Sequence, residues 1–249
     1  MPLLEVAGVR KRFGGLHAVS GASLDVEPGE IVGLIGPNGA GKTTLFHLIS
    51  GFLAADDGDV RFDGASLRGF RPHQVCQRGL ARTFQIVKPF PGLTILENVR
   101  VGAFARTRAF GDATRKAREV LELVGLADRA SRVAGGLTLA DRKRLELARA
   151  LATEPRLLLL DEVMAGLTPV ETERMIALCR AINARGIAIL LIEHVMRAVM
   201  TLSHRIVVLN QGVVIATGPP SEIARDPRVV EAYLGEADAD VSEGEHAGA

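Results

Sequence analysis

Residues 31–44 of this chain read IVGLIGPNGAGKTT, and this stretch decides the fold. Its first five residues, Ile31–Ile35, form a continuous apolar run that predicts a strand buried on both faces. A loop with the pattern G-x-x-x-x-G-K-[ST] follows, and Thr43–Ser50 is expected to be helical. Glycines let the backbone wrap closely around phosphate groups, and the helix N-terminus adds the positive end of its dipole. The sequence therefore predicts a phosphate-binding loop made of Gly36, Pro37, Asn38, Gly39, Ala40, Gly41, Lys42, Thr43 and Thr44.

A second apolar run, Leu157–Leu160, ends in the adjacent carboxylates Asp161 and Glu162. Taken alone, this is an ordinary strand end, but together with a phosphate loop it predicts nucleotide chemistry at the carboxyl edge of a sheet. Lys42 would reach the β- and γ-phosphates, and the Thr43 hydroxyl would coordinate Mg²⁺. Asp161 would orient the same ion with its water shell, and Glu162 would polarise the attacking water.

The rest of the chain alternates apolar strands with helices, which predicts an α/β fold with a mainly parallel sheet. Further strands are expected at Leu3–Val9, Gly21–Val26, Asp57–Asp63 and Ile187–Ile192, with a hairpin joining Ile206–Leu209 to Val213–Ala216. Helices are expected at Ala113–Val124, Ala140–Ala152 and near Val195–Leu202, and another begins with a capping box at Thr168-Pro169-Val170-Glu171 and stops at Gly186. The helical middle is expected to be a subdomain inserted into the sheet.

Composition excludes several classes of protein. Of the 249 residues, 47% are apolar, and the formal net charge of +1 argues against disorder and against a basic nucleic-acid protein. The longest clean apolar run, Ile187–Ile192, is far shorter than a membrane-spanning helix, and the first residues lack a secretion signal. Two distant cysteines, Cys76 and Cys179, favour a reducing compartment. Residues 236–249 are expected to be an acidic, disordered tail.

With these motifs the chain resembles the ATP-binding-cassette (ABC) ATPases from about Leu3 to Gly235. The resemblance implies a domain over residues 1–235 with a P-loop NTPase (RecA-like) core, an N-terminal antiparallel β subdomain and an α-helical subdomain inserted at roughly residues 96–152. It also implies ATP and Mg²⁺ as cofactors. One position that matches the family is Phe13, the aromatic that stacks on adenine.

Three more positions follow the same resemblance. Gln85 matches the glutamine that meets Mg²⁺ and the transmembrane partner, and Ala165–Thr168 matches the loop that contacts a second ATPase subunit. His194 matches the histidine that contacts the γ-phosphate. Each residue alone also fits a packed or surface position, so the resemblance depends on their joint order and spacing along the chain.

One motif departs from the family. The signature L-S-G-G-Q is replaced by Leu137-Thr138-Leu139-Ala140-Asp141, although the basic helix after it follows the pattern. Thr138 keeps a hydroxyl that could bind the γ-phosphate of a partner subunit in trans. Because both glycines are absent, we expect an altered grip on that phosphate.

Three stretches, beginning at Arg82, Leu93 and Asp161, look like the branched-chain amino-acid uptake branch of the family. The resemblance implies an ATPase at the cytoplasmic face of the plasma membrane, permeases that dock near Gln85 and the helical insert, and a solute-binding protein outside. A second ATPase subunit would complete a homodimer or heterodimer, and the altered signature favours the heterodimer. The alternative is a non-transport ABC ATPase that acts on ribosomes or DNA, which the single cassette disfavours.

Overall fold

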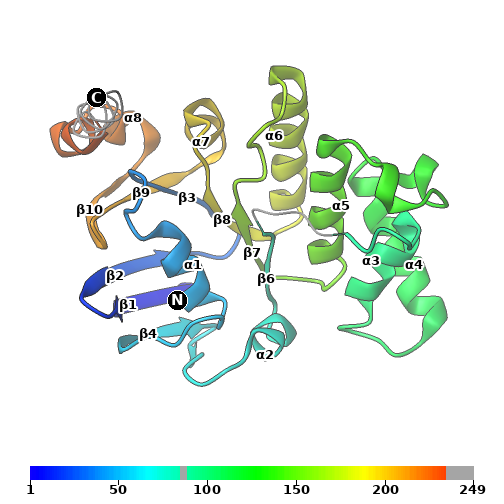
Figure 1. The fold of residues 1–249 in the computed structure, drawn as a ribbon, viewed down its shortest axis with the longest axis horizontal. Coiled ribbons are helices and arrows are strands. Elements are labelled where there is room, and N and C mark those ends of the chain that lie inside the picture. The colour runs from blue at the N-terminus through cyan, green and yellow to red at the C-terminus, as the bar shows by residue number, and fades with distance from the viewer. Residues whose placement is uncertain (85–88, 234–249) are drawn as a thin grey trace, which may run out of the picture.

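The structure is a computed structural model, and it describes residues 1–84 and 89–233. Gln85 and the acidic residues 236–249 lie outside the described residues. Figure 1 shows an antiparallel sheet in blue and cyan, a central sheet crossing the middle of the molecule, and a group of green helices at one end.

The central sheet has six strands in the order β10-β9-β3-β8-β7-β6. Every neighbouring pair is parallel except β9 and β10, which form the expected hairpin. Their bounds are β3 Ile31–Ile35, β6 Leu80–Arg82, β7 Leu157–Asp161, β8 Ala188–Ile192, β9 Arg205–Asn210 and β10 Val213–Gly218. The predicted mainly parallel sheet is confirmed, and β6, too short to show a pattern, is an addition.

The apolar runs are continuous because their residues alternate between two cores. In β3, Ile31 and Ile35 join one cluster, whereas Val32 and Leu34 join the other. The strands β7 and β8 divide in the same way, so neither face of the sheet is open to water at these three strands. This double burial pins each strand in register, because a slip of one residue would exchange the two faces.

A second sheet, β2-β1-β4-β5, is antiparallel and packs its apolar face on the cluster shared with α1 (Lys42–Ile49). Its strands are β1 Leu4–Phe13, β2 Leu16–Val26, β4 Asp57–Phe62 and β5 Ala65–Ser66. The first two are longer than the sequence predicted and meet in a turn at Gly14–Gly15. The basic run Arg10–Arg12 has no apolar alternation, which is why the pattern ended early.

The other helices are α2 Pro72–Gln77, α3 Ile95–Ala103, α4 Phe110–Leu123, α5 Leu139–Leu151, α6 Pro169–Asn183, α7 Met196–Leu202 and α8 Pro220–Ile223. The three helices α3, α4 and α5 lie between β6 and β7 in the chain and gather at the right of Figure 1. The capping box of α6 is confirmed, since the Thr168 hydroxyl accepts the Glu171 N–H. Among the described residues, none of the helices is both long and apolar enough to cross a bilayer.

The β3–α1 loop is wedged against the hairpin of the central sheet. A Cβ atom built on Gly36 would lie 1.9 Å from the Leu209 carbonyl oxygen, whereas one built on Gly39 meets open space. We therefore expect Gly36→Ala to lower the free energy of unfolding by about 2–5 kcal/mol, because the loop must shift. Gly39→Ala should cost only about 1 kcal/mol, for its left-handed backbone.

The measurement is urea unfolding of both variants in the absence of nucleotide, so that changes in ATP affinity do not contribute. Equal losses for the two variants would show that the backbone conformation, and not the contact with Leu209, requires the glycine at position 36.

Candidate functional site

The predicted phosphate loop connects the end of β3 to the first turn of α1. Gly41 caps α1 in the left-handed region at φ 102°, and the Ala40 carbonyl accepts the Gly212 N–H at 2.9 Å. The buried Lys42 folds back over the loop, and its Nζ donates to the Gly36 and Pro37 carbonyl oxygens at 2.6 and 2.8 Å. The first N–H groups of a helix have no acceptor within it. The loop therefore combines a fixed ammonium with a helix N-terminus, which suits a polyphosphate.

The central sheet brings the second predicted motif to the same edge. Ile192 of β8 is paired with Leu34 on one side and with Asp161 on the other. The residues after all three positions therefore leave the sheet at one edge. The phosphate loop, the two carboxylates and the segment with His194 emerge there together.

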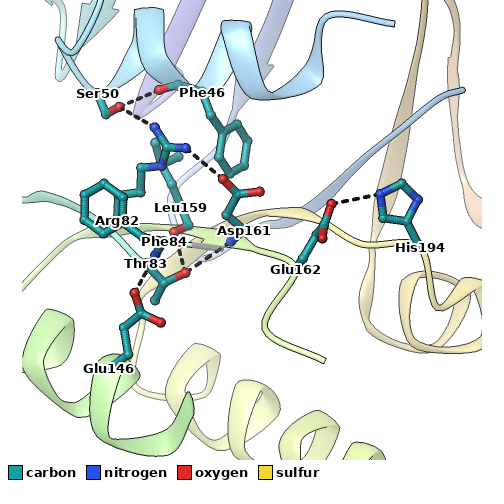
Figure 2. A network of polar contacts seen from close by, with 10 residues as sticks. All are labelled: Phe46, Ser50, Arg82, Thr83, Phe84, Glu146, Leu159, Asp161, Glu162 and His194. Atoms are coloured by element: carbon teal, nitrogen blue, oxygen red, sulfur yellow. Dashed lines mark hydrogen bonds and ion pairs between the residues drawn. The ribbon is translucent and has the colours of Figure 1, made fainter. Parts of the chain in front are cut away.

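Asp161 is not a free carboxylate. Its side chain is 3% exposed, and Oδ2 accepts a hydrogen bond from Nη2 of Arg82 at 2.7 Å (Figure 2). Thr83 follows Arg82, and its hydroxyl accepts the Asp161 N–H at 3.1 Å. The end of β6 thus fixes both the backbone and the carboxylate of Asp161.

Arg82 is held in an aromatic cage that the sequence did not reveal. Its guanidinium carbon lies 5.6, 5.9 and 5.3 Å from the ring centres of Phe46, Phe52 and Phe84. Nη1 also donates to the Ser50 hydroxyl at 3.3 Å, while the buried Nε has no hydrogen-bond partner in the described part of the chain. A cation over aromatic rings loses less on desolvation, so the cage stabilises the buried pair with Asp161.

Glu162 and His194 meet directly, as Figure 2 shows. Nε2 of His194 lies 2.9 Å from Oε1 of Glu162, and the Glu162 N–H donates to the Ile192 carbonyl. Glu162 has φ 50°, in the left-handed region that residues with side chains rarely adopt. A carboxylate paired with an imidazole can accept a proton from water while the imidazole orients a neighbouring oxygen.

Two other predicted residues, Phe13 and Thr43, are exposed. Phe13 ends β1 with 47% of its surface exposed, and Nζ of Lys11 lies 5.7 Å from its ring centre. Thr43 is exposed on the first turn of α1. Gln85 lies outside the described residues, so its placement stays a prediction.

The altered signature forms the N-terminus of α5. The Thr138 hydroxyl caps the helix by accepting the Asp141 N–H at 3.2 Å. Asp141 is buried between Arg129 and Arg144 and makes an ion pair with each. The residue that replaces the family's glutamine therefore makes ion pairs within the helical insert.

Three buried charged residues next to the site were missed by the sequence analysis: Lys143 and Glu146 on α5, and Glu193 after β8. Burial raises the pKa of both Glu146 and Glu193 to about 7, although each accepts a backbone N–H, from Phe84 at 2.6 Å and from Met164 at 2.7 Å. Burial lowers the pKa of Lys143. Lys143 shares the buried face of its helix with Ala140 and Leu147. A charged residue at an apolar position of the helical pattern is the sequence feature that could have pointed to it.

The oxygen donors at this edge suit a hard cation such as Mg²⁺. Asp161 supplies a carboxylate and Thr43 a hydroxyl, the donor types that Mg²⁺ accepts. Within residues 1–84 and 89–233, no group of three or more His, Cys, Asp or Glu side chains could hold a metal ion. The side chains of Asp161 and Thr43 leave room in an octahedral shell for phosphate oxygens and water, which nucleotide-bound Mg²⁺ usually keeps.

Comparison with protein families gives two matches. The family described as "ABC transporter" matches residues 19–165, and the one described as "Branched-chain amino acid ATP-binding cassette transporter" matches residues 213–239. Among curated relatives, the high-affinity branched-chain amino acid transport ATP-binding protein BraF of Pseudomonas aeruginosa is 44% identical over 95% of this chain and 99% of its own length. LivG of Escherichia coli K12, with the same description, is 43% identical over the same shares.

Solved structures agree. A nucleotide-free ATP-binding cassette from an ABC transporter superposes with a TM-score of 0.86 at 32% identity, covering 94% of this chain and 99% of that one. The ADP conformation of MJ1267, also an ATP-binding cassette of an ABC transporter, gives the same values. The expected fold class is confirmed.

The buried Glu146 predicts a pH dependence of stability. Its pKa rises from 4.5 to about 7 on folding, so between these values the folded chain holds a proton that the unfolded chain has lost. Its contribution to stability therefore falls as pH rises through this window. Glu146→Gln does not titrate, and its stability relative to the parent should improve by up to about 3 kcal/mol between pH 5 and pH 8.

Urea unfolding at a series of pH values measures the difference, with Glu122→Gln on the exposed side of α4 as the matched control. Glu193 has the same dependence but is present in every variant and cancels in the comparison. A Glu146→Gln difference that stays constant with pH would contradict the prediction.

Proposed function

We propose that this chain, which belongs to the ABC transporter family as one of its ATP-binding cassettes, drives the uptake of branched-chain or other hydrophobic amino acids through separate membrane permeases. The observation that carries the catalytic part is the 2.9 Å contact between Glu162 and His194, at the sheet edge shared with the phosphate loop. The relatives named as branched-chain amino acid transport proteins support the choice of solute. They do not favour a role on ribosomes or DNA.

In the proposed site, Phe13 stacks on the adenine, and residues 36–44 hold the phosphates with Lys42 beside the γ-phosphate. When Mg²⁺ is bound, it neutralises charge on the phosphates; Thr43, Asp161 and Gln85 would hold it. Glu162 accepts a proton from the attacking water, while His194 contacts the γ-phosphate and orients Glu162. Such catalysis depends mostly on positioning and charge neutralisation.

A second ATPase subunit completes the proposed site. The N-terminus of α5, with Thr138, would cover the γ-phosphate of the partner, and residues 165–168 would line the contact. Hydrolysis removes the γ-phosphate that bridges the two subunits, so the pair opens. Asp141 is engaged with Arg129 and Arg144, and both signature glycines are absent. These observations support pairing with a different subunit whose signature is intact.

The proposed permease contact is a cavity of about 330 Å³ between the core and the helical insert. Its lining includes Phe52, Arg82, Phe84, Val101, Glu146 and Arg149. Aromatic walls with a few charged groups suit a short amphipathic helix. With such a contact the chain would lie peripherally at the cytoplasmic face of the membrane, with a solute-binding protein on the other side.

The role of Glu162 is tested by Glu162→Gln. We expect ATP affinity to be unchanged, because an amide of the same size keeps the packing, and hydrolysis to slow by about 100-fold or more because the proton acceptor is lost. The variant should accumulate a closed, ATP-bound pair of subunits and should abolish leucine uptake in cells that carry the permeases. Phosphate release, size-exclusion chromatography with ATP and radiolabelled uptake are the measurements.

If this variant hydrolyses ATP at the parental rate, Glu162 is not the proton acceptor. If the variant hydrolyses ATP slowly but cells that carry it still take up leucine, isoleucine and valine normally, these amino acids are not the transported solutes.

The permease contact is tested by Val101→Asp, which places a charge in the cavity. We expect loss of co-purification with the permeases, while ATP affinity of the isolated chain stays within about 2-fold of the parent, because Val101 lies on α3 away from the phosphate loop. Val230→Asp is the control, since Val230 is equally exposed but does not line the cavity. If both variants assemble with the permeases as the parent does, the contact lies elsewhere.

A further inference from the structure

The segment after β7 is held by two side chains that come from different parts of the chain. The Glu162 carbonyl oxygen accepts a hydrogen bond from Nζ of Lys143 at 2.6 Å. Two residues later, the Met164 N–H donates to Oε1 of Glu193 at 2.7 Å. Lys143 belongs to α5, and Glu193 immediately precedes His194. The backbone around Glu162 is therefore tied to the helical insert on one side and to the histidine segment on the other.

Both side chains are buried at a cost that simple packing does not explain. Lys143 is 6% exposed and Glu193 2% exposed, and Oε2 of Glu193 has no hydrogen-bond partner among the described residues. The Lys143 ammonium is attracted by the carboxylates of Glu193, Glu146 and Glu162. Buried charges of this kind concentrate at functional sites, because apolar residues would fill the same volume with less loss of hydration.

We infer that Lys143 and Glu193 are positioning residues for ATP hydrolysis: they hold the backbone of residues 162–164 so that the Glu162 carboxylate meets His194. The inference rests on the proposed role of Glu162. Neither residue contacts the proposed nucleotide directly; both act through the conformation of Glu162.

The left-handed conformation of Glu162 is the reason that such support is needed. At φ 50° a residue with a side chain is strained, and it stays there only when its neighbours fix it. The hydrogen bond from Lys143 satisfies the Glu162 carbonyl oxygen, which would otherwise favour another backbone conformation. Glu193 adds the matching constraint, since its bond to Met164 fixes the separation between the segments that carry Glu162 and His194.

The first experiment compares Lys143→Met with Lys143→Arg in the assembled transporter. Methionine keeps the length and volume but donates no hydrogen bond, so we expect kcat to fall by about 10- to 100-fold while KM for ATP changes little. Arginine can still donate to the Glu162 carbonyl and should restore a large part of the rate. Lys116→Met removes a lysine on α4 that pairs with Glu154 after α5; this variant is the control and should match the parent. Rates are expressed per ATP-binding site, so partial unfolding does not count as lost catalysis.

The second experiment is a double-mutant cycle with Glu162→Gln, measured in single turnovers. Because Lys143 acts through Glu162, Lys143→Met should cause little further loss once Glu162 is replaced. If the rate of the double variant falls by the product of the two single losses, the inference is overturned. A parental kcat in Lys143→Met would also overturn it. If Glu162→Gln itself hydrolyses ATP at the parental rate, the proposed base fails, and that result is distinguishable from failure of the positioning role.

Glu193 provides a second route should Lys143→Met fold poorly. Glu193→Gln keeps an oxygen that accepts the Met164 N–H and should retain most of the rate, whereas Glu193→Met removes the acceptor and should lower kcat as Lys143→Met does. Equal rates in these two Glu193 variants would contradict the inference.

Discussion

The parallel register of β3, β8 and β7 is the constraint on which the rest of the site depends. Ile192 lies between Leu34 and Asp161, so three chain segments reach the carboxyl edge at the same level. The register is fixed by burial of both sheet faces, since a one-residue slip would move every side chain into the wrong core. The phosphate loop and the Glu162–His194 pair therefore leave the sheet at the same edge because the apolar side chains of these strands pack into the two cores.

Positive charge near the site is supplied by a few buried side chains. The chain is almost neutral overall, with a formal net charge of +1, so its net charge does not attract phosphate. Positive charge is instead placed singly: Lys42 at the loop, Arg82 against Asp161, and Lys143 under Glu162. Each is buried and engaged by backbone carbonyls or carboxylates. Buried charges with fixed partners do not reorganise when charge develops in a reaction, and this makes them effective despite their small number.

The sequence predicted what depends on local pattern. The strand Ile31–Ile35 and the capping box at Thr168 agree with the structure because continuous apolar runs and caps are local signals. The aromatic cage of Arg82 was not predictable, because Phe46 and Phe52, in and just after α1, are far from Arg82 in the sequence. The bond from Lys143 to the Glu162 carbonyl was hidden for a similar reason, since a backbone acceptor leaves no trace in the sequence. Roles assigned by resemblance, such as that of Phe13, remain predictions.

One helix, α5, connects most of the proposed functional contacts. Its N-cap is Thr138, and its second turn carries Lys143, which donates to the Glu162 carbonyl. Glu146 accepts the Phe84 N–H and lines the cavity that we propose as the permease contact. With 13 residues it is about 20 Å long, a length over which a helix is stiff. A rotation of α5 would therefore displace the partner-facing cap, the support of Glu162 and the wall of the cavity together. The altered signature replaces residues at the first of these positions only, while the bond from Lys143 and the bond from Glu146 are present. In the proposed function, α5 would therefore still link the permease contact to the site of its own chain.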